Sequence, residues 1–493
     1  MHLVVVVHGL WGNCSQMNHI KAELEKYHPT NTIVYTTGTH AGYLTYDGID
    51  VNGKRIRDEI VAETERLETT GTSVTKISII GYSLGGLVCR YAIGLLYHEG
   101  YFDNIVPVNF VTFCSPHVGS LNASIGIRDR IYNYCAPYVL AITGSELFLK
   151  DNTYANTAMG KSNVNKLPLL VWMAEPNSYF YKGLQMFKHR ALYANTINDR
   201  RCSWYTASIS ALDPFNSMVN ENTSAYSFEY MENYAPTVLD ISKPINFQKI
   251  HHNSLYKSGT TFSRSILKRL RLVKVVLKMI VLAPVLGIFF MCNSVWERIK
   301  LHVRVRSYLR DHSSVLSTIK ESLPQPPEND QAANEIARDT CHESFFYSFE
   351  TYLASHFKDQ TEVFVDNVFD AVNTERYHDY TYSITTAKGK GTSTPKGITR
   401  SIKQMDEDEK QALLDNSIIN LEGQTLSDFR VRLTNSQLYI VKHLNDLKWE
   451  KYPVIIRKTK LAHAAAIYRL DIPAYDEGKV VVRHFAKEVF KDE

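Results

Sequence analysis

The chain has 493 residues, enough for about three domains of ordinary size or for one large domain with insertions. Hydrophobic residues make up 44% and charged residues 22% of it, which argues against a disordered, collagen-like or polytopic membrane protein. The 55 Lys and Arg residues against 51 Asp and Glu leave a net charge of +4, so any nucleic-acid-binding surface would have to be local. Seven cysteines without paired spacing indicate reduced thiols rather than a disulfide framework or a zinc site.

The first third of the chain alternates short apolar runs with charged helical stretches, which predicts a doubly wound, mostly parallel α/β sheet. The apolar run at 3–7 lacks the basic flank and the length of a signal peptide and suits a strand covered on both faces. The expected strands are 2–8, 32–37, 76–81, 108–114 and 191–197, and the expected helices are 15–27, 54–68 and the segment that follows residue 83. Residues 119–190 break this rhythm, and we interpret them as a cap inserted over the sheet.

Composition changes sharply in residues 261–310, where eleven basic residues and one acidic residue give a local charge of +10. Residues 279–296 inside this segment carry no charge, and a helix of 18 residues would rise about 27 Å, just short of an average hydrocarbon core. Pro284 and Gly287 interrupt the run, and both of its flanks are basic. We therefore expect a hairpin or an interfacial helix with both ends on the cytosolic side of a membrane. A buried core helix is the alternative.

The second half of the chain is less regular. Residues 311–440 contain PQPPEND and are expected to form a linker and an insertion, with a helix that begins near Asp406. The β/α rhythm returns in residues 441–493, where we expect extended segments at 454–459, 464–470 and 480–484 and then a short helix. This return is expected to complete the core that residues 1–260 form.

The segment KISIIGYSLGGL carries the strongest chemical signal. Gly81-Tyr82-Ser83-Leu84-Gly85 matches G-x-S-x-G directly after an expected strand and before an expected helix. In such a nucleophile elbow the serine lies on a tight, strained turn, and flanking glycines avoid side-chain clashes there. We therefore predict that Ser83 is a nucleophile; an ordinary turn serine is the alternative.

A serine nucleophile needs donors for the oxyanion of its tetrahedral intermediate. The loop HGLWG (8–12) follows the first expected strand and offers backbone amides at the same edge of the sheet. The backbone amides of Leu10 and Leu84 are therefore the predicted oxyanion hole, with Gly9 and Gly12 allowing close approach. The alternative for the loop is a plain turn between a strand and a helix.

The acid and the base should follow the serine in the order Ser, Asp or Glu, His. Asp199 follows the strand expected at 191–197, at the edge where Ser83 should emerge, so it is the predicted acid. Asp213 and Asp240 are the alternative candidates for the acid.

Four downstream histidines are candidates for the base, namely His251, His252, His463 and His484. His484 is preferred because it ends an extended segment, where a loop could bring the imidazole over the sheet. His463 precedes the segment expected to be extended at 464–470, which would place it at the opposite edge. His117 lies at the right edge but precedes Asp199 in the chain, and it is interpreted as a pocket-lining or structural residue.

These motifs resemble the serine esterases of fungi, close to the lipid-droplet phospholipase group. The resemblance depends on HGLWG (8–12), GYSLGGLVCRY (81–91), FCSPHVGS (113–120), YANTINDR (193–200) and VVVRHF (480–485). It implies an α/β-hydrolase fold, catalytic Ser83, Asp199 and His484, hydrolysis of glycerolipid esters and association with lipid droplets. The chain departs from the family at the acid, because no Val-Pro pair follows Asp199.

The sequence thus predicts a lipase or phospholipase that needs no metal or organic cofactor and acts on the surface of a lipid droplet or a membrane. Phospholipid is favoured over neutral lipid because the basic flanks of the apolar segment suit an anionic surface. The alternatives are a monoacylglycerol or neutral-lipid esterase and a non-catalytic lipid-droplet scaffold. No nucleic-acid partner is expected.

Overall fold

The computed structural model describes residues 1–122, 127–151, 154–155, 166–199, 201–215, 226–227, 229–243, 246–247 and 430–492. The apolar segment, the helix expected near Asp406 and most of the expected linker lie outside these residues. Within the described ranges, no helix has both the length and the apolar character needed to cross a membrane.

A single six-stranded sheet forms the centre of the fold, in the order β10-β7-β4-β3-β1-β2 with every neighbouring pair parallel. The strands are β1 (His2–Val7), β2 (Thr32–Thr36), β3 (Lys76–Tyr82), β4 (Val106–Phe113), β7 (His189–Asn195) and β10 (Glu450–Val454). Five of them agree with the expected strands. The sixth, β10, begins four residues before the predicted 454–459 and ends at the first residue of that segment.

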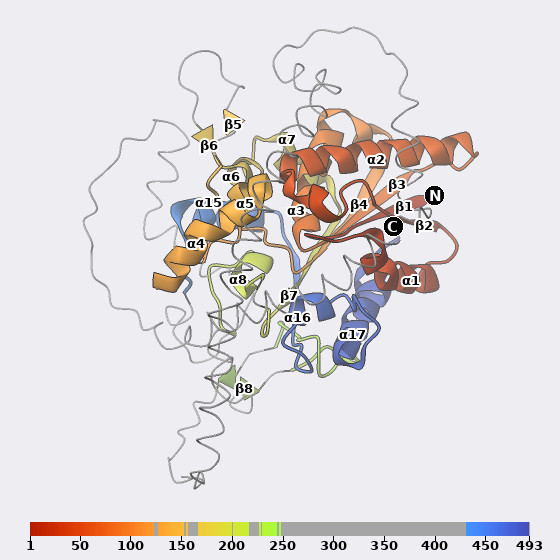
Figure 1. The fold of residues 1–493 in the computed structure, drawn as a ribbon. Coiled ribbons are helices and arrows are strands. Elements are labelled where there is room, and N and C mark those ends of the chain that lie inside the picture. Colours follow the sequence, from red (N-terminus) through yellow and green to blue (C-terminus); the bar gives the residue numbers. More distant parts are fainter. Residues whose placement is uncertain are drawn as a thin grey trace, which may run out of the picture.

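Helices cover both faces of the sheet, as a doubly wound parallel sheet requires (Figure 1). One face packs against α2 (Ile49–Thr69), α3 (Leu84–His98) and α7 (Tyr179–Met186), and the other packs against α1 (Asn18–Tyr27) and α17 (Asp476–His484). Alternate residues of β1 belong to the two cores, with Leu3 and Val5 on the first face and Val4 and Val6 on the second. This alternation explains why the whole apolar run is buried.

The chain between β4 and β7 is mainly helical. It contains α4 (Ile127–Val139), α5 (Ala141–Leu147), the short pair β5 (Tyr154–Ala155) and β6 (Lys166–Leu167), α6 (Leu169–Trp172) and α7. Helix α7 packs directly on α3, so the end of the predicted cap belongs to the helical layer of the sheet. Beyond β7 lie α8 (Trp204–Ala207) and the pair β8 (Tyr226–Ser227) and β9 (Asn246–Phe247).

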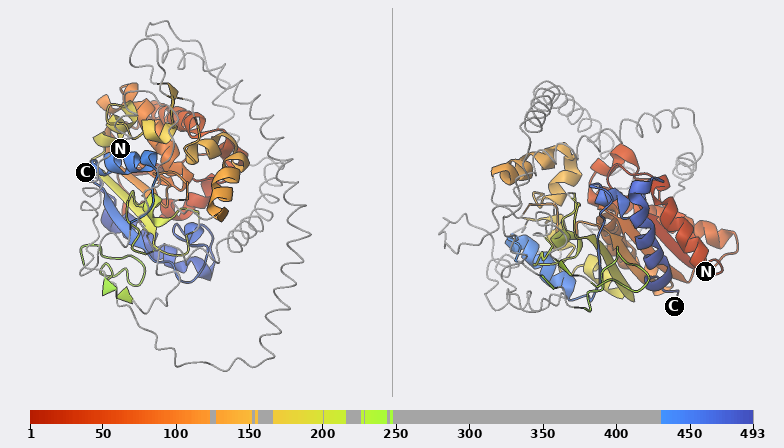
Figure 2. Two further views of the ribbon diagram at one scale, coloured as in Figure 1. Left: turned by 90° about the vertical axis from the view of Figure 1, so that its left-hand side faces the viewer. Right: turned by 90° about the horizontal axis from the view of Figure 1, so that it is seen from below.

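The C-terminal part returns to the same domain. Helix α15 (Asn435–Asn445) begins with a capping box between Thr434 and Gln437, and β10 then pairs with β7 at the edge of the sheet. Figure 2 shows this blue part beside the N-terminal elements, with both termini on the same side.

Two of the extended segments predicted near the C-terminus are wrong. The chain at 464–470 begins inside α16 (Ala462–Ala465), and residues 480–484 lie in α17, which continues into a π-helical turn at Phe485–Val489. Val481, Val482 and Phe485 fall on one face of this helix and are buried against the sheet. The three valines therefore follow a helical pattern, although their β-branched side chains favour a strand in isolation.

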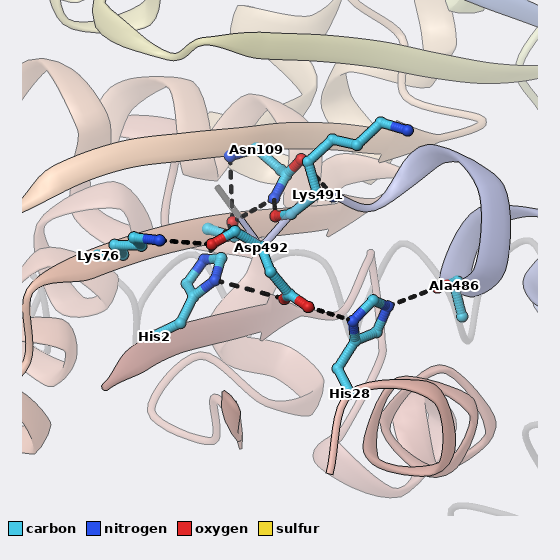
Figure 3. A network of polar contacts seen from close by, with 8 residues as sticks. His2, His28, Lys76, Asn109, Ala486, Lys491 and Asp492 are labelled. Carbon is cyan, nitrogen blue, oxygen red and sulfur yellow. Dashed lines mark hydrogen bonds and ion pairs between the residues drawn. The ribbon is translucent and has the colours of Figure 1, made fainter. Parts of the chain in front are cut away.

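A polar network attaches the last residues to the amino ends of the central strands (Figure 3). The Asp492 carboxylate lies 2.6 Å from His28 Nδ1 and 3.9 Å from His2 Nδ1, and its backbone carbonyl accepts a hydrogen bond from Lys76 Nζ. His28 Nε2 contacts the carbonyl of Ala486 at 2.7 Å. His2 and Lys76 begin β1 and β3, so this network lies at the end of the sheet opposite Ser83.

Candidate active site

Ser83 lies in the tight turn between β3 and α3, with φ 54° and ψ −126°. This conformation is strained for a residue with a side chain, and the turn is held by a hydrogen bond from the Ser83 amide to the carbonyl of Phe113 at 2.8 Å. A Cβ on Gly81 would lie 2.5 Å from Gly86 Cα, and one on Gly85 would lie 2.5 Å from the carbonyl oxygen of Val7. The glycines of the motif are therefore required because backbone passes directly beside them.

Three side chains from distant parts of the sequence meet at the carboxyl edge of the sheet. His463, in α16, has its Nε2 atom 2.8 Å from Ser83 Oγ and its Nδ1 atom 2.9 Å from Asp199 Oδ2. Asp199 follows β7, and α16 follows β10, the neighbouring strand. Hydroxyl, imidazole and carboxylate thus lie in series at hydrogen-bond distance, an arrangement that can activate a serine as a nucleophile.

The Asp199 carboxylate is fixed from several sides. Its Oδ1 atom accepts hydrogen bonds from the amides of Arg201 and Cys202 at 3.1 and 2.9 Å, and its Oδ2 atom accepts one from Asn195 Nδ2 at 2.9 Å. Burial alone would raise the pKa of Asp199, but the charge and hydrogen bond of His463, together with the Cys202 and Asn195 donors, hold that pKa below its ordinary value. The carboxylate therefore remains ionised and can orient the imidazole.

The structure corrects the assignment of His484 as the base. His484 ends α17, is fully buried, and has its Nδ1 atom 2.7 Å from the hydroxyl of Tyr193. Its ring packs against Tyr234 and Tyr452, and burial lowers its pKa to about 4. The prediction depended on a strand at 480–484 with a free carboxyl end, whereas the helix directs this ring into the core beneath the sheet.

His463, rather than His484, lies beside Ser83 because β10 ends earlier than predicted. The segment after Val454 leaves the carboxyl edge of the sheet, and α16 begins there instead of a strand that starts at the opposite edge. None of the other candidates within the described residues contacts Ser83 in place of His463. His117 is buried with Nε2 2.9 Å from Thr112 Oγ1, Asp213 accepts from the Phe215 amide, and Asp240 accepts from Ser242. His251 and His252 lie outside the described residues.

The loop at 8–12 lies directly on the elbow. A Cβ on Gly9 would come within 2.7 Å of Ser83 Cβ, and the amide of Gly12 closes a turn onto the carbonyl of Gly9 at 3.0 Å. The Trp11 amide donates a hydrogen bond to Thr45 Oγ1 at 3.2 Å. Leu84 is the first residue of α3, where backbone amides have no partner within the helix. The amides of Leu10 and Leu84 therefore stay the predicted oxyanion donors.

Three residues of the site were missed at the level of sequence. The hydroxyl of Tyr82 donates to the backbone carbonyl of His463 at 3.0 Å, and Cys114 and Asn195 lie beside Asp199. Tyr82 belongs to the motif itself, so its position could have been suspected. Asn195 ends β7 and Cys114 directly follows β4 at the same edge of the sheet, but nothing in their spacing distinguishes them from core residues.

The parallel sheet, the elbow after β3 and the Ser83–His463–Asp199 series together define an α/β-hydrolase fold with a serine-type site. Residues 1–211, which contain β1 to β7 and the turn at Ser83, match the family described as "Putative serine esterase (DUF676)".

Fungal relatives carry the same kind of name. The chain is 28% identical over 54% of its length to "Putative lipase C4A8.10" of Schizosaccharomyces pombe and 28% identical over 50% of its length to "Putative lipase ROG1" of Saccharomyces cerevisiae. The matched parts are 34% and 33% of those proteins, so the chain spans about a third of the length of the relatives it matches. Among solved structures, phospholipase PlaB from Legionella pneumophila matches with 14% identity over 43% of this chain and 42% of that chain, at a TM-score of 0.27.

Proposed function

We propose that this protein is a serine hydrolase that cleaves acyl esters of glycerophospholipids at the surface of a membrane or lipid droplet. The observation that carries the proposal is the continuous contact from Ser83 through His463 to Asp199. The names of the fungal relatives support a lipid ester as substrate. The basic flanks of residues 279–296 support an anionic, phosphate-bearing surface.

The geometry gives each group one task. Ser83 Oγ attacks the ester carbonyl while its proton moves to His463 Nε2, and Asp199 stabilises the imidazolium that forms. The oxyanion develops beside the amides of Leu10 and Leu84. The imidazolium then gives its proton to the departing alcohol, which leaves an acyl-serine.

Water completes the cycle by the same route. His463 Nε2 takes a proton from the water that attacks the acyl-serine, and returns it to Ser83 Oγ when the fatty acid leaves. The chemistry needs no metal or organic cofactor. Tyr82 keeps the base in place throughout, because its hydroxyl binds the backbone of His463 rather than the reacting ring.

The test is a panel of lipid esters with purified protein. We expect cleavage of glycerophospholipids in vesicles, labelling of the wild type by a fluorophosphonate probe, and neither in Ser83→Ala. Labelling of the wild type with cleavage of monoacylglycerol or triacylglycerol alone would replace phospholipid by neutral lipid. If the probe does not label the folded wild type, the enzymatic proposal is contradicted. A non-catalytic lipid-droplet scaffold would then be the remaining interpretation.

A further inference from the structure

A second set of ligand atoms surrounds the acid side of the site. Cys114 Sγ, one carboxylate oxygen of Asp199 and one imidazole nitrogen of His463 all lie within 4.8 Å of one another. Thiolate, carboxylate and imidazole are the ligands that Zn²⁺ prefers in proteins. Cys114 is 1% exposed, and the side chains of Asp199 and His463 are 1% and 9% exposed, so the set is almost enclosed.

Asn195 supplies a fourth donor to this set. Its Nδ2 atom lies 3.2 Å from Cys114 Sγ and 2.9 Å from Asp199 Oδ2, while its Oδ1 atom is buried and has no hydrogen-bond partner. A half-turn of the amide exchanges the two atoms and brings the oxygen between Cys114 and Asp199. A buried acceptor without a partner costs free energy, and a cation would satisfy it.

The spacing fits one tetrahedral ion. Zinc bonds of about 2.0–2.3 Å place neighbouring ligand atoms about 3.3–3.7 Å apart. The three separations that the structure gives are 2.9 Å from His463 Nδ1 to Asp199 Oδ2, and 2.9 and 3.2 Å from Asn195 to Asp199 and Cys114. These separations are shorter than the tetrahedral ones, whereas the ligand atoms of Cys114, Asp199 and His463 lie within 4.8 Å of one another, so side-chain shifts of up to about 1.5 Å would admit the ion.

We propose that Cys114, Asn195, Asp199 and His463 form an inhibitory Zn²⁺ site that switches the hydrolase off; this inference rests on the proposed function. A metal on His463 Nδ1 occupies the nitrogen that otherwise donates to Asp199. The imidazole proton must then lie on Nε2, where it faces Ser83 Oγ as a donor. An Nε2–H group cannot accept the serine proton, so the nucleophile is no longer activated.

Ligand binding and loss of activity are measured separately. Co²⁺ replaces Zn²⁺ in such sites, and we expect one Co²⁺ per chain with the visible bands of tetrahedral cobalt and a thiolate-to-cobalt charge-transfer band. In parallel, Zn²⁺ should abolish fluorophosphonate labelling of Ser83, and EDTA should restore it. A cobalt spectrum without the thiolate band would overturn the site on the wild-type protein alone, whether or not any ester is cleaved.

Cys114→Ser and Cys14→Ser form the variant pair. Serine keeps a hydroxyl donor near Asp199 but removes the soft sulfur, whereas Cys14 is a half-buried thiol at the start of a 3-10 turn far along the chain from the set. Relative to its own metal-free labelling rate, Cys114→Ser should need more than about tenfold higher Zn²⁺ for half-inhibition, and Cys14→Ser should match the wild type. Equal Zn²⁺ sensitivity in Cys114→Ser and the wild type would contradict the proposal, whereas absent labelling in metal-free wild type would contradict the proposed function instead.

Discussion

The conformation of a single residue, Ser83, determines where the chemistry can occur. Its positive φ orients the hydroxyl toward the imidazole of His463, and the close approach of Gly9 leaves no room for any other side chain against it. The neighbouring Asp199 remains ionised because its amide donors and His463 outweigh the cost of burial. The hydroxyl of Ser83, the imidazole of His463 and the carboxylate of Asp199 thus come from the segments that follow three different strands, β3, β10 and β7.

The choice between the two histidines can be tested directly. His463→Ala removes the only imidazole in contact with Ser83 within the described residues, so kcat should fall by several orders of magnitude. His484→Ala leaves the contacts of Ser83 intact and should cost mainly stability. Steady-state kinetics on a soluble short-chain ester would compare them, and a larger loss of kcat in His484→Ala would contradict the geometry.

Tyr82 is expected to act as a positioning residue. Tyr82→Phe keeps the ring against His463 but removes the hydrogen bond to its carbonyl, so kcat should fall about two- to tenfold with little change in KM. Tyr193→Phe is the matched control, because it also removes one buried hydroxyl, that which contacts His484, away from Ser83. Equal effects of the two substitutions on kcat would show that Tyr82 acts only through stability.

At the scale of elements, α17 is a helix whose run of three valines at 480–482 resembles the sequence of a strand. Val481 and Val482 pack on the sheet, and His484 completes that buried face through its contact with Tyr193. The imidazole is neutral there because burial lowers its pKa to about 4. The same helix also ends close to the network of Asp492, which attaches the end of the chain to β1 and β3.

This burial predicts a pH dependence of folding stability. The folded pKa of His484, about 4, lies below the ordinary value of 6.5, so the unfolded chain binds more protons between these values and stability falls as pH decreases from 6.5 to 4. His484→Gln should reduce the slope of the unfolding free energy against pH by up to about one proton in this window. Urea unfolding between pH 4.5 and 7 measures it.

The control for the pH experiment is His98→Gln, at an exposed position at the end of α3. It should leave the slope of the unfolding free energy unchanged. An unchanged slope in His484→Gln would mean that this imidazole does not resist protonation in the folded protein.

At the scale of the whole molecule, parts of the chain on either side of residues 261–310 form one domain. β10 pairs with β7, and His463 contacts Ser83 and Asp199 across this interval of sequence. A segment that crossed a membrane once would put these partners in different compartments. Any membrane contact of residues 279–296 must therefore leave both flanks on the same side.

We propose that burial of the uncharged run 279–296 and attraction of its basic flanks to anionic headgroups anchor the protein, so deletion of this run should release it from membranes or lipid droplets. Cleavage of soluble esters should persist, because Ser83, His463 and Asp199 all lie outside the deletion. Flotation of vesicles measures the first and ester hydrolysis the second. Retention on membranes after deletion would exclude this segment as the anchor.

The topology has its own test. Tags placed near residues 258 and 325 should both be cleaved by protease added to intact vesicles, since the flanks must share a compartment. Protection of one tag alone would be incompatible with the contact between Ser83 and His463 in the membrane-bound protein.

Local patterns determined the N-terminal half of this fold and the tight turn that carries Ser83. Buried parallel strands are continuous apolar runs, and a strand, a tight glycine-flanked turn and a helix are consecutive in the chain, so β1, β3, β4 and Ser83 could be predicted without tertiary information. Asp199 was accessible for a related reason, since the carboxyl ends of parallel strands share one edge. The histidine beside Ser83 could not be predicted in this way, because His463 reaches that edge only through the early end of β10 and the helical turn after it. Whether VVVRH forms a strand or a helix depends on which face the sheet leaves to be covered, and that is decided by packing between residues hundreds of positions apart.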